Sequence, residues 1–251
     1  MKKIIFALMI VSLTSLADAQ EIKLVTENWP PMNYEKNGDV TGIATEIVQA
    51  TLNKAGIKAY PHIYPWVRAY RMASEQKNVL IYTIRRTRKR DPLFKWICPL
   101  VPSQSVFLYK LKKRTDIVIN SLEDAKKYTV GEVRGDAGAD FLLKHGFVKN
   151  KNLELVARGE QNIKKLFAER ITLILDTELS LAYLTKSVGK PFDQLEKAFL
   201  LYEGGEDICM AFSKTTPDEL AERVRAAFEE VRAEGTPEAV MEKYLKSLKE
   251  R

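Results

Sequence analysis

The stretch ITLILDTELSLAYLTK, residues 171–186, consists of a short apolar run that passes directly into a helical pattern. Residues 171–175 have the length and near-continuous hydrophobicity typical of a strand buried on both faces. Asp176 ends this strand, and the residues from Thr177 to about Lys186 predict a helix. A buried strand followed by a helix is the repeating unit of α/β proteins, whose parallel sheets carry helices on both sides.

The same alternation of strand and helix extends over the rest of the chain. Further strands are predicted at residues 22–26, 79–84, 106–109, 128–130 and 153–156, and further helices at residues 42–55, 136–144, 161–169, 216–234 and 236–248. No stretch rich in Gly, Ser or Pro divides the chain. The sequence therefore predicts an α/β fold with parallel-rich sheets, in lobes joined by crossing strands and not by a flexible linker.

The composition excludes several classes of protein. Of the 251 residues 45 % are hydrophobic, and charges of both signs are mixed throughout, which excludes intrinsic disorder. Two cysteines cannot form a disulfide scaffold, and no Cys/His cluster has the spacing of a zinc site. A net charge of +7 is ordinary for this length. The basic run at residues 85–90 is isolated, so we expect no nucleic-acid partner.

The N-terminus has the pattern of an export signal. Lys2 and Lys3 precede an apolar run at residues 4–13, and Ala17 and Ala19 then form a small-x-small cleavage site. The apolar run is about half the roughly 20 residues that a membrane-spanning helix needs, which argues against an anchor. We expect residues 1–19 to be a removed signal peptide and the mature protein to lie in the periplasm.

Six short segments resemble, in the same order, those of a known family. They are LVTENWPP at 24–31, GIATEIV at 42–48, TRKR at 87–90 followed by FKW at 94–96, SLED at 121–124 followed by VGEVRG at 130–135, LILD at 173–176, and VRAEGT at 231–236. They resemble segments of the extracellular solute-binding proteins of family 3, the amino-acid-binding components of ABC importers, and the resemblance extends over nearly all of the mature chain, from Glu21 to Leu248.

This resemblance implies a two-lobe periplasmic-binding-protein fold of type II, a Venus flytrap that closes on its ligand. Lobe 1 would hold residues 20–102 and 206–251, and lobe 2 would hold residues 103–205, with two crossover strands between them. The expected function is capture of a small polar solute, an amino acid or another carboxylate, by a monomer that delivers it to an ABC permease. Neither a cofactor nor a metal is expected.

Two other functions remain open on the same fold. One is a periplasmic enzyme similar to cyclohexadienyl dehydratase, in which Glu27, Asp136 and Asp176 could act as acid or base. The other is a sensory protein that presents its ligand to a receptor. No nucleophile or metal motif supports an enzyme, so we expect binding without catalysis.

The resemblance also implies a set of ligand-binding residues. Arg90, the arginine of the TxxR segment, would bind the ligand's carboxylate through its guanidinium fork. Asp176 would bind the ligand's ammonium, although an aspartate at this place could instead cap the following helix. Trp29 and Trp66 would enclose the ligand side chain, unless they belong to the core.

Further ligand contacts are expected from both lobes. They are Glu27, Thr83, Arg85, Arg134, Gly135 and Asp136. Gly135 and Asp136 open a helix whose free amide groups could bind an anion. The family usually has Ser or Thr here, and a carboxylate that faces a ligand carboxylate is unfavourable. Asp136 therefore indicates a ligand with extra charge, or one that is not an α-amino acid.

Cys98 and Cys209 are the only cysteines. In the family fold they would lie on neighbouring strands of lobe 1 near the hinge, where a disulfide is possible in an oxidising compartment. Adjacent parallel strands rarely provide the geometry that a disulfide needs. The expectation is therefore two buried thiols, with the disulfide as the alternative.

Overall fold

The computed structural model describes residues 21–204 and 207–249, and its first sheet has the strand order β4-β1-β5-β12-β6. The strands are β1 (Lys23–Thr26), β4 (Pro61–Ile63), β5 (Val79–Arg85), β6 (Phe94–Val101) and β12 (Ile208–Ser213). β1 pairs in parallel with β4 and β5, whereas β12 runs antiparallel to both β5 and β6. We call this sheet and the helices that cover it the first lobe.

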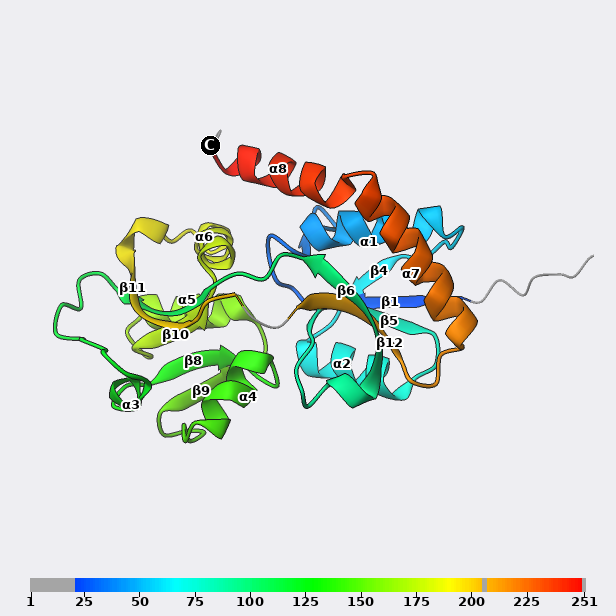
Figure 1. The fold of residues 1–251 in the computed structure, drawn as a ribbon. Helices are drawn as coiled ribbons and strands as arrows, with labels where there is room; N and C mark the ends of the chain where they lie inside the picture. The colour runs from blue at the N-terminus through cyan, green and yellow to red at the C-terminus, as the bar shows by residue number, and fades with distance from the viewer. Residues whose placement is uncertain (1–20, 205–206, 250–251) are drawn as a thin grey trace, which may run out of the picture.

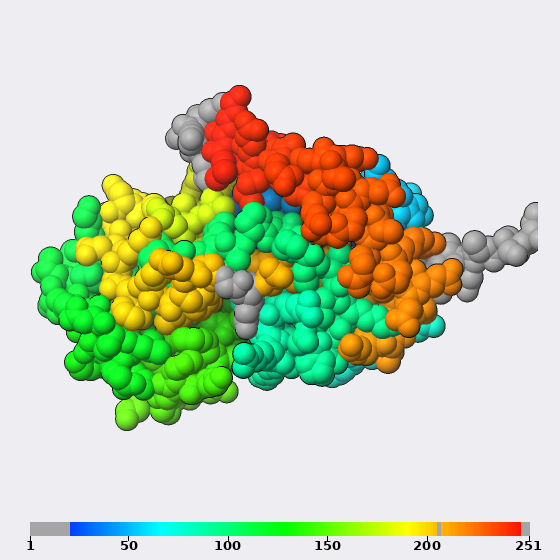
Figure 2. All heavy atoms as spheres, viewed as in Figure 1, coloured from blue at the N-terminus to red at the C-terminus, as the bar shows by residue number. Residues whose placement is uncertain are grey.

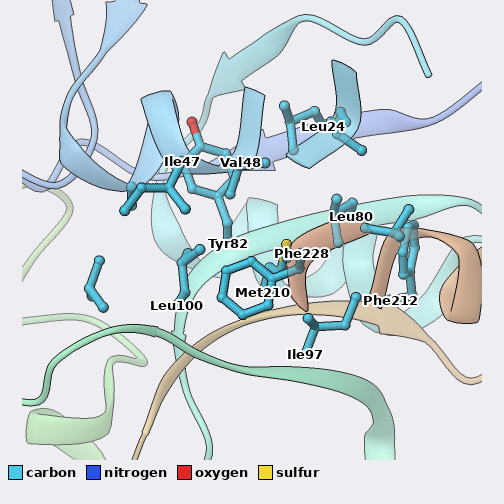
Figure 3. Close-up of a cluster of buried hydrophobic side chains, with 14 of the residues drawn as sticks. Leu24, Ile47, Val48, Leu80, Tyr82, Ile97, Leu100, Met210, Phe212 and Phe228 are labelled. Carbon is cyan, nitrogen blue, oxygen red and sulfur yellow. The ribbon is translucent and has the colours of Figure 1, made fainter. Parts of the chain in front are cut away.

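Helices cover both faces of the first sheet because its central strands are apolar on both sides. Leu80 and Tyr82 of β5 pack toward α1 (Ile43–Lys54) and α7 (Asp218–Ala233), as Figure 3 shows in part. Val79 and Ile81 of the same strand pack toward α2 (Trp66–Glu75) on the opposite face. This is the burial that a continuous apolar run predicts. α8 (Thr236–Lys249) follows α7 and contacts α1.

The second sheet has the order β11-β7-β10-β8-β9 and forms the second lobe, which lies beside the first (Figure 1). Its strands are β7 (Val106–Leu111), β8 (Val130–Val133), β9 (Leu153–Val156), β10 (Leu173–Asp176) and β11 (Leu195–Tyr202). The helices of this lobe are α3 (Leu122–Ala125), α4 (Ala137–Lys144), α5 (Gly159–Phe167) and α6 (Glu178–Ser187). The short ribbon of β2 (Tyr34–Lys36) and β3 (Asp39–Thr41) and the 3-10 turns η1 (Asp91–Leu93) and η2 (Phe192–Gln194) complete the fold.

The predicted α/β class with two helix-covered sheets is confirmed, and both sheets are mixed. Each contains two parallel and two antiparallel pairings. The antiparallel strands are those next to the two passages between the lobes, from β6 to β7 and from β11 to β12. β7 was among the predicted strands, whereas β6, β11 and β12 were not, although β12 is a fully buried strand followed by α7.

The predicted lobe boundaries stay predictions, and one of the two lies among the described residues. The boundary at 102/103 lies between Val101, where β6 ends, and Val106, where β7 begins. The boundary at 205/206 and the signal peptide at residues 1–19 lie outside the described residues. Within the described ranges, no helix combines the length and hydrophobicity that crossing a membrane requires.

The two cysteines form a disulfide, so the expectation of two buried thiols is wrong. The sulfur atoms of Cys98 and Cys209 are 2.04 Å apart, and the Cα atoms are 4.7 Å apart. The expectation assumed parallel neighbours, but β6 and β12 are antiparallel. Both cysteines lie where the register of this antiparallel pairing shifts, Cys98 between Ile97 and Val101 and Cys209 between Ile208 and Met210. Their Cα separation is within the range that a disulfide spans.

The amide groups at the start of α1 hold a loop at residues 27–33 against the first sheet. Ile43 N–H donates to the Pro31 carbonyl and Ala44 N–H donates to the Met32 carbonyl, both at 2.9 Å. Asn33 Nδ2 in turn donates to the Glu27 carbonyl at 2.6 Å. This loop carries Glu27, Asn28 and Trp29, so the beginning of α1 positions three side chains at the lobe boundary.

Gly42→Ala is expected to loosen this loop and to lower the free energy of unfolding by roughly 1–3 kcal/mol. Gly42 has φ 126°, and a Cβ atom there would lie 2.4 Å from the Met32 carbonyl oxygen. Urea unfolding measures the effect. Gly56→Ala is the control, because Gly56 has φ 67° but nothing within 4 Å of the added Cβ. Equal losses in the two variants would show that the close approach to Met32 is unimportant.

Candidate functional site

A cavity of about 80 Å³ lies between the two lobes, and polar residues from both lobes line it. Figure 2 shows the lobes meeting along their boundary, the second lobe in green and yellow and the first in teal and orange. Six predicted site residues line the cavity: Glu27, Trp29, Thr83, Arg85, Asp136 and Asp176. The other four, Trp66, Arg90, Arg134 and Gly135, do not line it.

The strand ends explain why these residues meet. Glu27 follows β1, and Arg85 ends β5, in the first lobe. Asp176 ends β10, and Asp136 lies shortly after β8, in the second lobe. Parallel strands bring their carboxyl ends to one edge of a sheet, which is where α/β proteins bind ligands. In each sheet this edge faces the cavity, so the two edges lie on opposite sides of it.

Asp176 is held in place by the beginning of α6. Its Oδ1 accepts a hydrogen bond from the Thr177 amide at 2.7 Å, and its Oδ2 accepts one from the Ser180 hydroxyl at 2.9 Å. The residue that caps α6 is Thr177, whose side chain accepts from the Ser180 amide. Burial raises the pKa of Asp176 to about 7, against an ordinary value of 3.8, and the nearby carboxyl of Asp136 adds to the rise.

Glu27 and Glu132 bring two further carboxyl groups to the cavity. Burial, followed by the negative charge of Asp136, raises the pKa of each well above the ordinary value. Arg90 opposes this rise at Glu27. Glu132 is only 6 % exposed, and its Oε1 accepts from the Val133 amide at 2.6 Å. Sequence reasoning missed Glu132, although a charged residue inside the short apolar strand 130–133 could have indicated it.

Asp136 caps the helix that was expected to bind an anion. Its Oδ1 accepts from the Ala137 amide at 2.6 Å, at the first residue of α4. A side-chain carboxylate here satisfies a free amide group and complements the helix dipole. The protein's own carboxylate therefore lies at the N-terminus of α4, beside the cavity.

Arg90 lies behind the cavity, where it joins the lobes. The side chain is 3 % exposed, and its guanidinium carbon lies 4.9 Å from the ring centre of Trp66 and 5.4 Å from that of Tyr70. Nη2 donates to the Gly135 carbonyl at 3.1 Å, and Trp66 Nε1 donates to the same oxygen at 2.8 Å. Two donors of the first lobe thus share one acceptor of the second, an arrangement that we call the Gly135 contact.

Other predicted residues have different surroundings. Trp29 Nε1 donates across the boundary to Ser180 Oγ at 3.0 Å. The Arg85 guanidinium lies 5.7 Å from the ring centre of Tyr202. Thr83 has φ 61°, and its hydroxyl donates to the Tyr82 carbonyl. Arg134 is exposed and donates to the Leu155 carbonyl at 3.3 Å, away from the cavity.

A larger open hollow of about 530 Å³ adjoins the cavity. Asn28 lines both spaces, and its Nδ2 donates across the boundary to Glu160 Oε1. Charged side chains of both signs line the hollow together with tyrosines: Glu35, Glu46, Glu160, Lys36, Lys186, Lys243, Tyr34, Tyr183 and Tyr244. Among the described residues, no cluster of three or more His, Cys, Asp or Glu side chains could hold a metal ion. The site therefore consists of a small, carboxyl-rich cavity with an open hollow beside it.

Comparisons with known proteins show a family match and a curated relative. Residues 22–247 match the profile of the bacterial extracellular solute-binding proteins, family 3. A curated relative, the probable amino-acid-binding protein YxeM of Bacillus subtilis (strain 168), is 24 % identical over 216 residues, which cover 85 % of this chain and 79 % of YxeM.

Solved structures show the same fold at low identity. One is a histidine kinase sensor domain with similarity to periplasmic binding proteins, with a TM-score of 0.77 and 16 % identity, over 90 % of this chain and 96 % of that one. Another is an ancestral arginine-binding protein bound to arginine, with a TM-score of 0.76 and 20 % identity, over 89 % of this chain and 97 % of that one. At such identities the likeness establishes the fold.

Proposed function

The chain belongs to the bacterial extracellular solute-binding proteins of family 3, and from this membership we propose that it captures a small polar solute bearing an amino group and delivers it to an ABC-type membrane transporter. We further propose that it is exported, with removal of residues 1–19, and that it acts as a monomer without chemical change to the solute.

One observation carries this proposal: the cavity lies between the lobes and is lined by polar groups from both. Glu27 and Arg85 of the first lobe line the same space as Asp136 and Asp176 of the second. A solute in this space contacts both lobes at once, so it favours the closed arrangement over an open one. A partner in the membrane can then distinguish the closed form from the empty protein.

Particular residues have separate roles in this proposal. Asp176 would bind the solute's ammonium, because its carboxylate has lone pairs beyond those used by Thr177 and Ser180. Trp29 would cover the solute while it donates to Ser180. The Gly135 contact would hold the lobes together. The role of Arg90 as the ligand for a carboxylate stays a prediction, and in this structure its guanidinium contacts the Gly135 carbonyl.

A thermal-shift screen of the refolded, ligand-free mature protein tests the proposal. A solute at about a thousand times its Kd stabilises by roughly 4 kcal/mol, which for a chain of this size raises the Tm by roughly 8–16 °C. The panel contains the common L-amino acids, small amines and small dicarboxylates. We expect a selective rise with solutes that carry an amino group. A flat response from protein with a native circular dichroism spectrum would contradict solute binding of this class.

Mass spectrometry of the recovered solute separates binding from catalysis. We expect the bound compound to be released unchanged after prolonged incubation with the protein. A product that accumulates beyond one equivalent per protein would instead indicate an enzyme. For variants of the cavity lining, Arg170→Ala is a suitable control, because Arg170 is exposed and does not line the cavity.

A further inference from the structure

The charges around the cavity are unbalanced. Four carboxyl groups line it, from Glu27, Glu132, Asp136 and Asp176, whereas Arg85 is the only basic residue among the described lining residues. Arg90 lies behind the lining, close enough to oppose the raised pKa of Glu27. Carboxyl groups therefore outnumber guanidinium groups even when both arginines are counted.

The groups that would bind a ligand carboxylate already form hydrogen bonds within the protein. The Arg90 guanidinium donates to the carbonyls of Gly135 and Arg85, at 3.1 and 3.3 Å. The Ala137 amide at the start of α4 donates to Asp136 Oδ1. A carboxylate placed in the cavity would thus meet the side chain of Asp136, and two carboxylates at short range repel strongly where water is scarce.

A cationic group in the cavity would instead be attracted by the surrounding carboxyl groups. Asp176, Asp136 and Glu27 lie at or after the ends of three different strands and line the cavity from both lobes. The rings of Trp29 and Tyr202 also line the cavity and can lie against the aliphatic or charged part of an amine. The volume of about 80 Å³ suits a head group, since an apolar cavity of about 150 Å³ already takes benzene.

From this arrangement we propose that the cavity takes the ammonium or guanidinium group of an organic cation that carries no carboxylate. This inference rests on the proposed function and restricts the class of solutes that the protein would bind. A larger cation can place the remainder of its chain in the hollow beyond Asn28, which adjoins the cavity.

Binding of a cation is then coupled to release of protons. Asp176 interacts electrostatically with Glu27 after β1, Glu132 of β8, Asp136 before α4 and Tyr109 of β7. Glu160 of α5 acts on Glu27, Glu178 of α6 acts on Tyr109, and Arg85 and Arg90 are the nearby cations. In the empty cavity burial keeps part of the carboxyl groups protonated. A bound cation stabilises the carboxylates and displaces those protons, so affinity decreases as the pH falls from 8 to 6.

Matched pairs of ligands test the proposal by isothermal titration calorimetry on the refolded mature chain. Agmatine and arginine differ by one carboxylate, and so do cadaverine and lysine. We expect the carboxylate-free member of each pair to bind at least tenfold more tightly, with release of a fraction of a proton near pH 7. The number of protons follows from titrations in buffers that differ in ionisation enthalpy.

The outcomes distinguish this inference from the proposed function. Tighter binding of arginine, lysine or glutamine than of the amines would overturn the inference and leave the solute-binding function intact. Absence of binding by every amino acid and amine, from folded protein, would overturn both.

Asp136→Ser provides a variant that keeps the helix cap and removes the charge, since Ser also caps helices well. We expect the preference for agmatine over arginine to fall at least fivefold. Asp140→Ser is the matched control on the same helix, because Asp140 pairs with Lys89 at 2.7 Å and does not line the cavity. An unchanged preference in Asp136→Ser, or an equal fall in both variants, would contradict the role given to the cavity carboxyls.

Discussion

Asp176→Asn is expected to weaken solute binding strongly and, at the same time, to stabilise the ligand-free protein. Loss of a buried charge partner costs about 2–5 kcal/mol of binding, so the affinity should fall at least thirtyfold. The Asn side chain keeps an oxygen that accepts from the Thr177 amide. The Ser180 hydroxyl can rotate, so that it accepts from the new amide group in place of donating to a carboxylate.

The gain in stability follows from the raised pKa. In the folded state Asp176 titrates near 7, whereas its ordinary value is 3.8. The folded protein thus retains a proton that the unfolded chain has released, and this contribution to stability is present below about pH 4 and is lost as the pH rises through 7. A buried carboxylate at pH 8 therefore costs stability, and its removal should return on the order of 2 kcal/mol after allowance for partial solvation.

Urea unfolding of both proteins at pH 8 and pH 4, without ligand, measures this effect. The variant should be more stable than the parent at pH 8, and the difference should disappear near pH 4. Asp193→Asn is the control, since Asp193 is an exposed aspartate of the second lobe outside the cavity. A variant that binds within threefold of the parent affinity would contradict the assignment of Asp176 to the solute.

Replacement of both cysteines by alanine is expected to lower the free energy of unfolding by about 4–5 kcal/mol. The disulfide joins residues that are 111 positions apart, so it closes a loop that contains the second lobe. Such a cross-link reduces the conformational freedom of the unfolded chain, and the reduction grows with the length of the loop. For a chain of this size, the loss corresponds to a decrease in Tm of roughly 8–20 °C.

Thermal and urea unfolding with and without a reducing agent check this result. The reducing agent should destabilise the parent protein and leave the Cys98→Ala/Cys209→Ala variant unchanged. A difference of less than 1 kcal/mol between the parent and the variant would contradict a stabilising disulfide. Solute affinity provides a second readout and should stay unchanged in the variant. The disulfide lies beside the passage from β11 to β12, and neither cysteine lines the cavity.

Local patterns predicted the elements with the strongest periodicity. The strand 171–175 and its helix correspond to β10 and α6, and the helix expected from Asp136 to Lys144 corresponds to α4. β11 could not be found in this way, since its burial alternates irregularly along Leu195–Tyr202. A strand at the edge of a sheet has one neighbour and an exposed side, so its sequence has no continuous apolar run.

Some residues of the candidate site could be predicted from the sequence and others could not. Residues that follow strand ends, such as Glu27 and Asp176, could be placed at the cleft because strand ends define it in this class of fold. Arg90 and Trp66 could not be placed, because the acceptor that they share, Gly135, belongs to the other lobe. The burial of Glu132 could not be predicted, because its carboxyl group lies beside Gly138 of α4, where a side chain would leave it no room.

The sequence by itself determined the α/β class, the family and the strand ends that carry most of the cavity lining. These depend on hydrophobic periodicity, capping residues and short segments, all of which act between neighbours along the chain. Only the tertiary structure decided the Cys98–Cys209 disulfide, the Gly135 contact and the excess of carboxyl groups around the cavity. Each of these depends on side chains that are distant in sequence and meet only when two sheets and two lobes pack, because packing sets their distances and their exposure to water.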